Sequence, residues 1–120
     1  MYLISLKRHF DAAHFIRGYH GKCEKTHGHR YEVTAYLETE KLDNRGIAFD
    51  FTELKIRLDE IINRYDHNCL NEVLPFDRIN PTAENIARNI YEQLKPTIKG
   101  AKLDAIEVWE SPDASVKYKP

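Results

Sequence analysis

Residues 23–37 read CEKTHGHRYEVTAYL, a stretch in which two histidines stand one position apart. Its second half is rich in β-branched and aromatic residues, which predicts a strand over His27–Glu38. Side chains alternate along a strand, so His27 and His29 are expected on one face, about 6.6 Å apart along the chain. Two imidazoles on one face, joined by a third from elsewhere, can hold a zinc ion and leave its fourth position open.

The third imidazole is expected from His14, at the end of a first strand predicted over Met1–Phe10. If the two strands pair antiparallel, the end of the first lies beside the start of the second, and the three histidines meet. Surface or satisfied core histidines are the ordinary alternative. A His-x-His pair with a third histidine at a compatible strand end favours metal binding instead. His9 and His20 lack such a context and receive no role.

The composition indicates one domain over residues 1–120, with 18 basic and 19 acidic side chains. This balance gives no global field that would draw the chain to nucleic acid or to a membrane. The first residues do not resemble a secretory signal and no apolar run reaches transmembrane length, so a cytoplasmic protein is expected. In that reducing compartment Cys23 and Cys69 are expected as free thiols, the second of them a small buried apolar group.

The predicted elements run strands, helices, strands along the chain. A first helix is predicted over Thr52–Tyr65 from a single apolar stripe, with Asp50 and Glu53 as a capping box. A second helix is predicted to begin near Thr82, which can cap it. The strands predicted near the C-terminal end are Leu103–Glu110 and Ser115–Lys119. The sum is an α+β domain in which an antiparallel sheet carries two helices on one face.

Two further sequence features could carry chemistry. Cys23 lies just before the histidine pair, where zinc or a histidinium would lower the thiol pKa and populate the reactive thiolate. The alternative makes Cys23 a fourth ligand that closes a structural zinc site. Asp66 and His67 follow the first helix, and a carboxylate beside an imidazole can fix its tautomer. Such a pair is more often a cap, and it can act as a relay only if the chain leaves the helix there.

Glu110 ends a predicted strand on the same face as Ile106 and Val108. Because burying an unpaired carboxylate is costly, a partner is expected there. A planar ligand with two parallel N–H donors would supply a bidentate, charge-assisted match. The alternative is that Glu110 reaches solvent at the end of its strand.

In this order, these pieces resemble the 6-pyruvoyltetrahydropterin synthase family, and most of all its 6-carboxy-5,6,7,8-tetrahydropterin synthase branch. The segments that carry the resemblance are Phe10-Asp11-Ala12-Ala13-His14, Cys23-x₃-His27-Gly28-His29-x-Tyr31, Asp50-Phe51, Asp66-His67-x₂-Leu70-Asn71, Pro81-Thr82-x-Glu84-Asn85 and Glu110. The resemblance implies a tunnelling fold, in which three chains join their sheets into a barrel. It also implies that two trimers stack into a homo-hexamer, with active sites between subunits.

The resemblance implies three sets of site residues. The Zn²⁺ ligands are expected to be His14, His27 and His29. The catalytic residues are expected to be Cys23 as the general base, with Asp66 and His67 in support from a neighbouring chain. The residues expected to bind the substrate are Glu110 at the 2-amino and N3 edge of a pterin, with Thr82 and Glu84 as weaker pocket candidates, and Glu24. Arg17, Lys22 and Lys25 are cations that could meet a triphosphate.

The substrate implied by the resemblance is 7,8-dihydroneopterin triphosphate, and the implied products are 6-carboxytetrahydropterin, acetaldehyde and triphosphate. This reaction belongs to queuosine and other 7-deazapurine pathways. Glu24 opens an alternative, because Glu-x-x-His-Gly-His also fits family members that feed folate synthesis and form 6-hydroxymethyl-7,8-dihydropterin. With Cys23 and Glu24 together, the chain could catalyse either reaction or both. Two other classes stay open: a non-catalytic zinc module, and a pterin-binding hydrolase or aldolase of similar fold.

Overall fold

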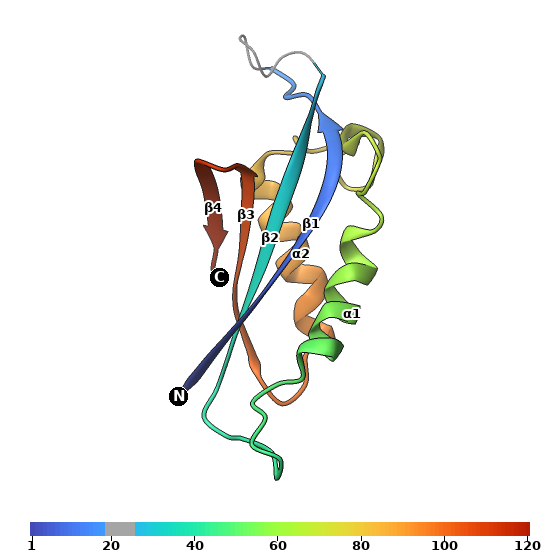
Figure 1. Ribbon diagram of the computed structural model, residues 1–120. Helices are drawn as coiled ribbons and strands as arrows, with labels where there is room; N and C mark the ends of the chain where they lie inside the picture. Colours follow the sequence, from blue (N-terminus) through green and yellow to red (C-terminus); the bar gives the residue numbers. More distant parts are fainter. Residues whose placement is uncertain (19–25) are drawn as a thin grey trace.

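A computed structural model describes residues 1–18 and 26–120, and its elements follow the predicted order (Figure 1). The strands are β1 (Tyr2–His14), β2 (His27–Thr39), β3 (Lys102–Ser111) and β4 (Ala114–Tyr118). The helices are α1 (Phe51–Ile62) and α2 (Ala83–Leu94), with short 3₁₀ helices η2 (Leu70–Glu72) and η3 (Lys95–Thr97). The strands form one sheet in the order β1-β2-β3-β4, and every neighbouring pair is antiparallel.

Both helices lie along the same face of the sheet, as Figure 1 shows, which confirms the predicted α+β arrangement. The apolar stripe of each helix is buried against the strands. The buried stripe residues are Leu54, Leu58, Ile61 and Ile62 from α1, and Ile86, Ile90 and Leu94 from α2. From the sheet, fully buried side chains such as Phe10 and Tyr31 complete one continuous core. No helix in the described ranges is long and apolar enough to cross a membrane.

The caps of both helices are those expected from the sequence. Asp50 accepts a hydrogen bond from the Thr52 N–H at 2.8 Å, and Thr82 accepts one from the Asn85 N–H at 3.1 Å. These bonds satisfy N–H groups that have no partner inside the helix. The other half of the expected capping box is not formed, because Glu53 pairs instead with Arg57 one turn on, at 3.9 Å.

Two element boundaries differ from the prediction by more than one residue. β1 continues four residues past Phe10, because Asp11 to His14 all pair with β2. The predicted end of α1 at Tyr65 is wrong, since the helix ends at Ile62 and gives way to a series of turns. The chain therefore leaves the helix before it reaches Asp66. This is the condition stated above for Asp66 and His67 to act as a relay.

The segment after these turns lies along the outer edge of β1. The His67 N–H donates to the Asp11 carbonyl at 2.6 Å, and the Ala13 N–H donates to the Asn68 carbonyl at 3.1 Å. Cys69 then forms an isolated parallel bridge with Ala13. The thiol of Cys69 is free and only partly buried, which corrects its expected place as a buried apolar group. This end of β1 is thus paired on both sides.

Candidate metal centre and adjoining cleft

Three histidines meet where β1 ends and β2 begins. In the antiparallel register His14 pairs with His27, and Ala12 pairs with His29. The ring centroids lie 4.8 Å (His14–His27), 5.1 Å (His14–His29) and 4.4 Å (His27–His29) apart. One ligand atom from each ring lies within 4.8 Å of the others. Small side-chain rotations would let all three bind a single ion.

The cluster lies on the helix-facing side of the sheet and rests on aromatic core residues. Tyr31 is fully buried, and its ring centroid lies 5.7 Å from that of His14 and 5.6 Å from that of His29. Phe10 stacks on Tyr31, at 4.9 Å between centroids. Close packing of this kind restricts the rotamers of the imidazoles and keeps water away from the base of the cluster.

One ring nitrogen of His14 is held by the backbone ahead of α2. Nδ1 donates to the Pro81 carbonyl at 2.9 Å, which leaves the lone pair on Nε2 in the neutral ring. Burial lowers the pKa of His14, although the Pro81 carbonyl and Glu110 oppose this, and burial also lowers the pKa of His29. Both rings therefore favour the neutral form, which is the form that binds metal.

The donor set fits a metal ion. Nε2 of His14 and Nε2 of His29 are buried and make no hydrogen bond within residues 1–18 and 26–120. Buried polar atoms without partners are rare because their desolvation is costly, and a bound cation would satisfy both lone pairs. Among the described residues, these three imidazoles form a group that could hold a metal ion, the donor type and number found in open zinc sites. A carbonyl bond to the remaining ring nitrogen is the usual support of such a ligand.

Glu110, at the end of β3, points toward the same cluster. Its Oε1 lies 3.1 Å from Nε2 of His14, without the alignment of a hydrogen bond, and its side chain is 34% exposed. Ile106 and Val108 on the same strand are fully buried, as the predicted alternation requires. Glu110 is therefore a half-buried carboxylate at the boundary between the histidines and solvent.

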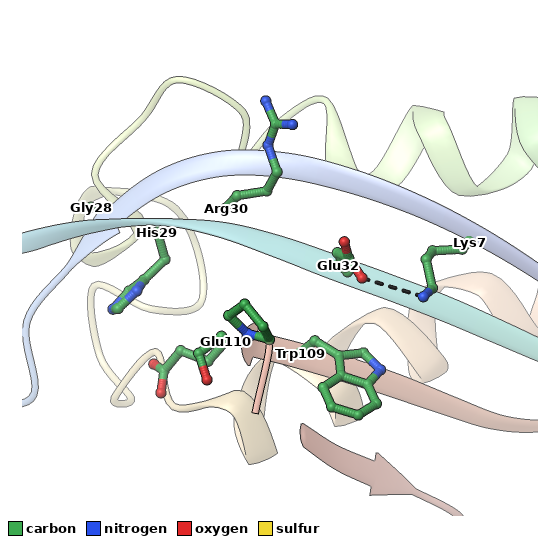
Figure 2. Close-up of a pocket in the computed structure, with 9 residues that line it drawn as sticks. Lys7, Gly28, His29, Arg30, Glu32, Trp109 and Glu110 are labelled. Atoms are coloured by element: carbon green, nitrogen blue, oxygen red, sulfur yellow. Dashed lines mark ion pairs between the residues drawn. The ribbon is translucent and has the colours of Figure 1, made fainter. Parts of the chain in front are cut away.

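A cleft of about 530 Å³ opens beside Glu110 (Figure 2). β2 pairs with β3 only from Glu32 onward, where Glu32 lies opposite Trp109. The residues of β2 before Glu32 therefore have no partner on β3 in this register. The lining includes His29, Arg30, Glu32, Trp109 and Glu110. Figure 2 shows Trp109 and Glu110 below β2, with the Lys7–Glu32 ion pair farther along the strand. The volume suits a small ligand that reaches the histidine cluster from solvent.

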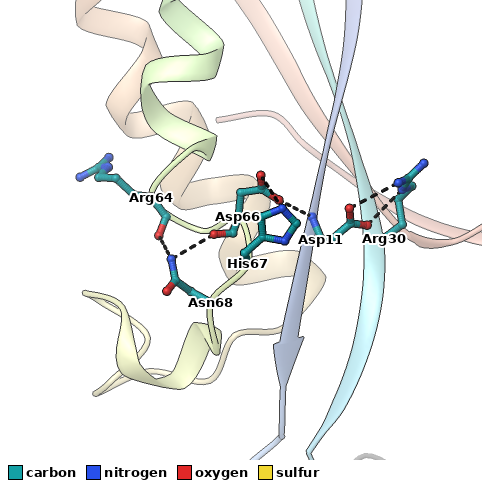
Figure 3. Close-up of polar contacts among 6 residues, drawn as sticks. All are labelled: Asp11, Arg30, Arg64, Asp66, His67 and Asn68. Carbon is teal, nitrogen blue, oxygen red and sulfur yellow. Dashed lines mark hydrogen bonds and ion pairs between the residues drawn. The ribbon is translucent and has the colours of Figure 1, made fainter.

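Asp66 and His67 form a pair, but at the outer edge of β1 (Figure 3). Oδ1 of Asp66 accepts a hydrogen bond from the Asp11 N–H at 2.9 Å, and Oδ2 lies 3.6 Å from Nε2 of His67. The His67 side chain is 79% exposed. In the described part of the chain this pair makes no hydrogen bond or ion pair with the three histidines. One chain therefore does not bring the two sets of predicted site residues together.

The remaining predicted pocket residues differ in their placement. Thr82 uses its hydroxyl as the cap of α2 and directly follows Pro81, whose carbonyl holds His14. Glu84 is exposed on the first turn of α2 and makes no hydrogen bond or ion pair within the described ranges. Cys23 and Glu24 lie outside the described residues, as do His20, Lys22 and Lys25.

Arg17 is occupied by backbone carbonyls. Its guanidinium donates to Phe76 at 2.8 Å, to Ile79 at 3.3 Å and to Asn71 at 3.5 Å. These bonds fasten the end of the first described segment to the loop before α2. Arg17 therefore has a structural role, and its contact with a triphosphate stays a prediction.

Two asparagines that received no role from the sequence hold the same segment. The Asn71 amide donates to the Phe15 carbonyl and accepts from the Phe15 N–H, both at 3.0 Å. The Asn80 amide makes the same two bonds to Arg17, at 2.9 Å for the N–H and 3.0 Å for the carbonyl. A side-chain amide can replace a neighbouring strand in this way. No local sequence signal indicates these partners, which lie more than fifty positions away along the chain.

The chain is similar to known proteins over nearly its whole length. The family model described as 6-pyruvoyl tetrahydropterin synthase matches residues 3–120. A relative from Archaeoglobus fulgidus, named putative 6-carboxy-5,6,7,8-tetrahydropterin synthase, is 35% identical over 92% of this chain and 90% of its own. The 6-carboxy-5,6,7,8-tetrahydropterin synthase of Synechocystis is 32% identical over 98% of this chain and 93% of its own.

Two further comparisons bear on activity and fold. A protein from Pyrococcus furiosus named dihydroneopterin monophosphate aldolase is 33% identical over 90% of this chain and 89% of its own. The structure of Caenorhabditis elegans 6-pyruvoyl tetrahydropterin synthase superposes with a TM-score of 0.85 at 26% identity, covering 100% of this chain and 97% of that one.

Proposed function

Because the chain belongs to the 6-pyruvoyl tetrahydropterin synthase family, we propose that it is a zinc-dependent carbon–carbon lyase acting on 7,8-dihydroneopterin triphosphate. The proposed products are 6-carboxy-5,6,7,8-tetrahydropterin, acetaldehyde and triphosphate, as in queuosine and other 7-deazapurine pathways. The names of the Archaeoglobus and Synechocystis relatives support this choice of product. The observation that carries the proposal is the cluster of three imidazoles beside Glu110 and an open cleft.

His14, His27 and His29 are the proposed zinc ligands. Their ligand atoms lie within 4.8 Å of one another, and two of them are buried without a hydrogen bond in the described part of the chain. When bound, zinc would supply a Lewis acid that polarises the hydroxyl groups of the substrate side chain. The aromatic base of the cluster and the Pro81 carbonyl would keep His14 in one orientation throughout.

Glu110 is the proposed anchor of the pterin ring. A carboxylate can accept two parallel hydrogen bonds from the 2-amino group and N3–H of a pterin. Its place between the histidines and the cleft would put the side chain of the substrate next to the metal. Thr82 and Glu84 are proposed as weaker contributors, and the exposed position of Glu84 gives it the smaller part.

Proton transfer is assigned to Cys23, Asp66 and His67. Cys23 would act as the general base, and Asp66 would support the charged form of His67, whose Nε2 lies 3.6 Å from its carboxylate. Because this pair lies at the edge of β1, apart from the three histidines, we propose that it serves the active site of a neighbouring copy. A homo-oligomer, in the form of a hexamer of two trimers, would then be the active state.

A second candidate activity is an aldolase reaction. It is favoured by the 33% identity to the Pyrococcus furiosus aldolase and by Glu24, which fits the pattern of folate-pathway members. Mass spectrometry of the pterin formed by the zinc-loaded protein separates the two. Formation of 6-carboxytetrahydropterin from the triphosphate supports the proposal. Formation of 6-hydroxymethyl-7,8-dihydropterin, from the triphosphate or the monophosphate, would replace it with the aldolase.

A further inference from the structure

His67 has a backbone conformation that residues with a side chain rarely adopt. Its φ is +58°, and no other non-glycine residue among 1–18 and 26–120 has a positive φ. This region favours glycine and, to a lesser extent, asparagine. A backbone of this kind persists only where surrounding contacts fix it, and it occurs preferentially at functional sites.

The side chain of Asn68 supplies two of the contacts that fix this turn (Figure 3). Its Nδ2 donates to the Arg64 carbonyl and to the Asp66 carbonyl, both at 3.1 Å. The Asn68 backbone N–H donates to the Tyr65 carbonyl at 3.2 Å, which closes a four-residue turn with His67 in its third position. One amide group therefore joins a carbonyl just ahead of the turn to a carbonyl within it.

Three more hydrogen bonds fasten the turn to the edge of β1. The Asp11 N–H donates to Oδ1 of Asp66 at 2.9 Å, and the Asp11 carbonyl accepts from the His67 N–H at 2.6 Å. The Ala13 N–H donates to the Asn68 carbonyl at 3.1 Å. β1 thus binds the N–H of His67, while the Asn68 amide binds the carbonyls of Arg64 and Asp66 that precede His67.

The imidazole held in this way has few partners in its own chain. The side chain is 79% exposed, and its one ion-pair contact in the described ranges is with Asp66. His67 thus has a strained backbone, several backbone restraints and an exposed side chain. This combination suits an imidazole that must be presented at a fixed angle to a group outside its own chain.

We propose that Asn68 is a positioning residue, whose amide holds the turn and thereby aims the His67 imidazole at the substrate in a neighbouring subunit. This inference rests on the proposed function, in which His67 takes part in proton transfer. Asn68 itself does not touch the substrate. Its loss lets the turn relax toward an unstrained backbone, which moves the imidazole away from the reacting atoms.

The first test is the kinetics of the zinc-loaded Asn68→Ala enzyme. Its kcat is expected to fall roughly 10- to 100-fold, with KM and zinc content unchanged. Asn68→Ser, which keeps one donor, should retain part of the rate. Asn63→Ala is the matched control, since Asn63 is an exposed asparagine at the end of α1 whose side chain makes no hydrogen bond in the described segments. An unchanged kcat in Asn68→Ala would overturn the proposal.

A double-mutant cycle shows whether Asn68 acts through His67. His67→Asn removes the imidazole but still suits a positive φ. In that background, Asn68→Ala is expected to change the residual rate by less than about twofold, because nothing remains to be positioned. A further loss of about tenfold would mean that Asn68 acts through another group, and the proposal would be wrong.

Amide hydrogen exchange tests the turn independently of activity. The amides of His67 and Ala13 are expected to exchange faster in Asn68→Ala than in Asn63→Ala. Equal exchange would show that the amide does not hold the turn. If the unmodified protein turns over no pterin, the proposed function is wrong, and the positioning role of Asn68 in catalysis is wrong with it. This outcome is distinguishable, because the exchange measurement can still show that the Asn68 amide holds the turn.

Discussion

Nε2 of His14 lies 3.1 Å from Oε1 of Glu110, although the two residues belong to the ends of strands that are not neighbours in the sheet. His14 is completely buried, whereas Glu110 is one-third exposed. The pair therefore marks the point where the closed histidine cluster meets the cleft. A substrate that enters the cleft would meet the carboxylate and the proposed zinc ligands together, which is the basis of the predictions that follow.

Glu110→Gln is expected to keep zinc and to lower kcat/KM by about 100-fold or more, because two charge-assisted hydrogen bonds to the pterin lose the charge of their acceptor. Steady-state kinetics and metal analysis of the same preparation provide the measurement. If zinc is lost to the extent seen in a histidine variant, Glu110 is a fourth ligand and its assignment to the pterin is wrong.

His27→Ala and His29→Ala are each expected to lose bound zinc, because three protein ligands leave none in reserve. Metal analysis after dialysis against a low zinc concentration measures the loss. His9→Ala is the matched control, since His9 is an exposed histidine on the same pair of strands. Full occupancy in both variants would refute the ligand assignment.

Removal of zinc with a chelator is expected to abolish turnover but leave the fold intact. The core between the sheet and the two helices is continuous and does not depend on the cluster. Zinc should add about 2–4 kcal/mol to the free energy of unfolding when present well above its dissociation constant. Circular dichroism and urea unfolding, with and without zinc, measure both effects. Loss of the fold on chelation would favour the structural zinc module instead.

Two inactive variants are expected to restore each other's activity when they assemble together. Cys23→Ala keeps an intact Asp66-His67 pair, and His67→Asn keeps an intact Cys23. In mixed oligomers with active sites between subunits, about a quarter of the sites would combine both intact residues. Co-expression and an activity assay test this. Recovery no greater than the sum of the separate variants would place each active site within a single chain.

Asn71→Ala is expected to lower the free energy of unfolding by about 2–4 kcal/mol, because it leaves both backbone groups of Phe15 without their partner. The asparagine is 6% exposed, so water replaces those bonds poorly. Urea denaturation measures the change. Asn44→Ala, at an exposed turn, is the control and should stay within about 0.5 kcal/mol of the unmodified protein.

The order of the elements and the helix caps were predictable because they depend on short-range patterns. Alternation over His27–Glu38 and the apolar stripe of α1 are visible within a dozen residues. The meeting of His14 with His27 and His29 follows once these two strands, which are consecutive in the sequence, are paired antiparallel. These inferences required no knowledge of distant contacts.

The end of α1 was not predictable, because distant residues compete for it. The apolar stripe continues to Tyr65, yet the chain after Ile62 turns toward β1, where the Asp11 backbone binds Asp66 and His67. The bonds of Arg17 and Asn71 likewise join residues more than fifty positions apart. No local pattern encodes such partners.

The amino-acid sequence alone was sufficient to establish the α+β class, the family resemblance and the grouping of His14, His27 and His29, since strand alternation and antiparallel pairing are local rules. Only the folded chain showed that His14 is buried against Pro81, that Glu110 faces it, and that the Asp66-His67 pair lies at the edge of β1. The physical reason is that burial and backbone hydrogen bonding depend on which distant segments pack together, and that packing exists only in the tertiary structure.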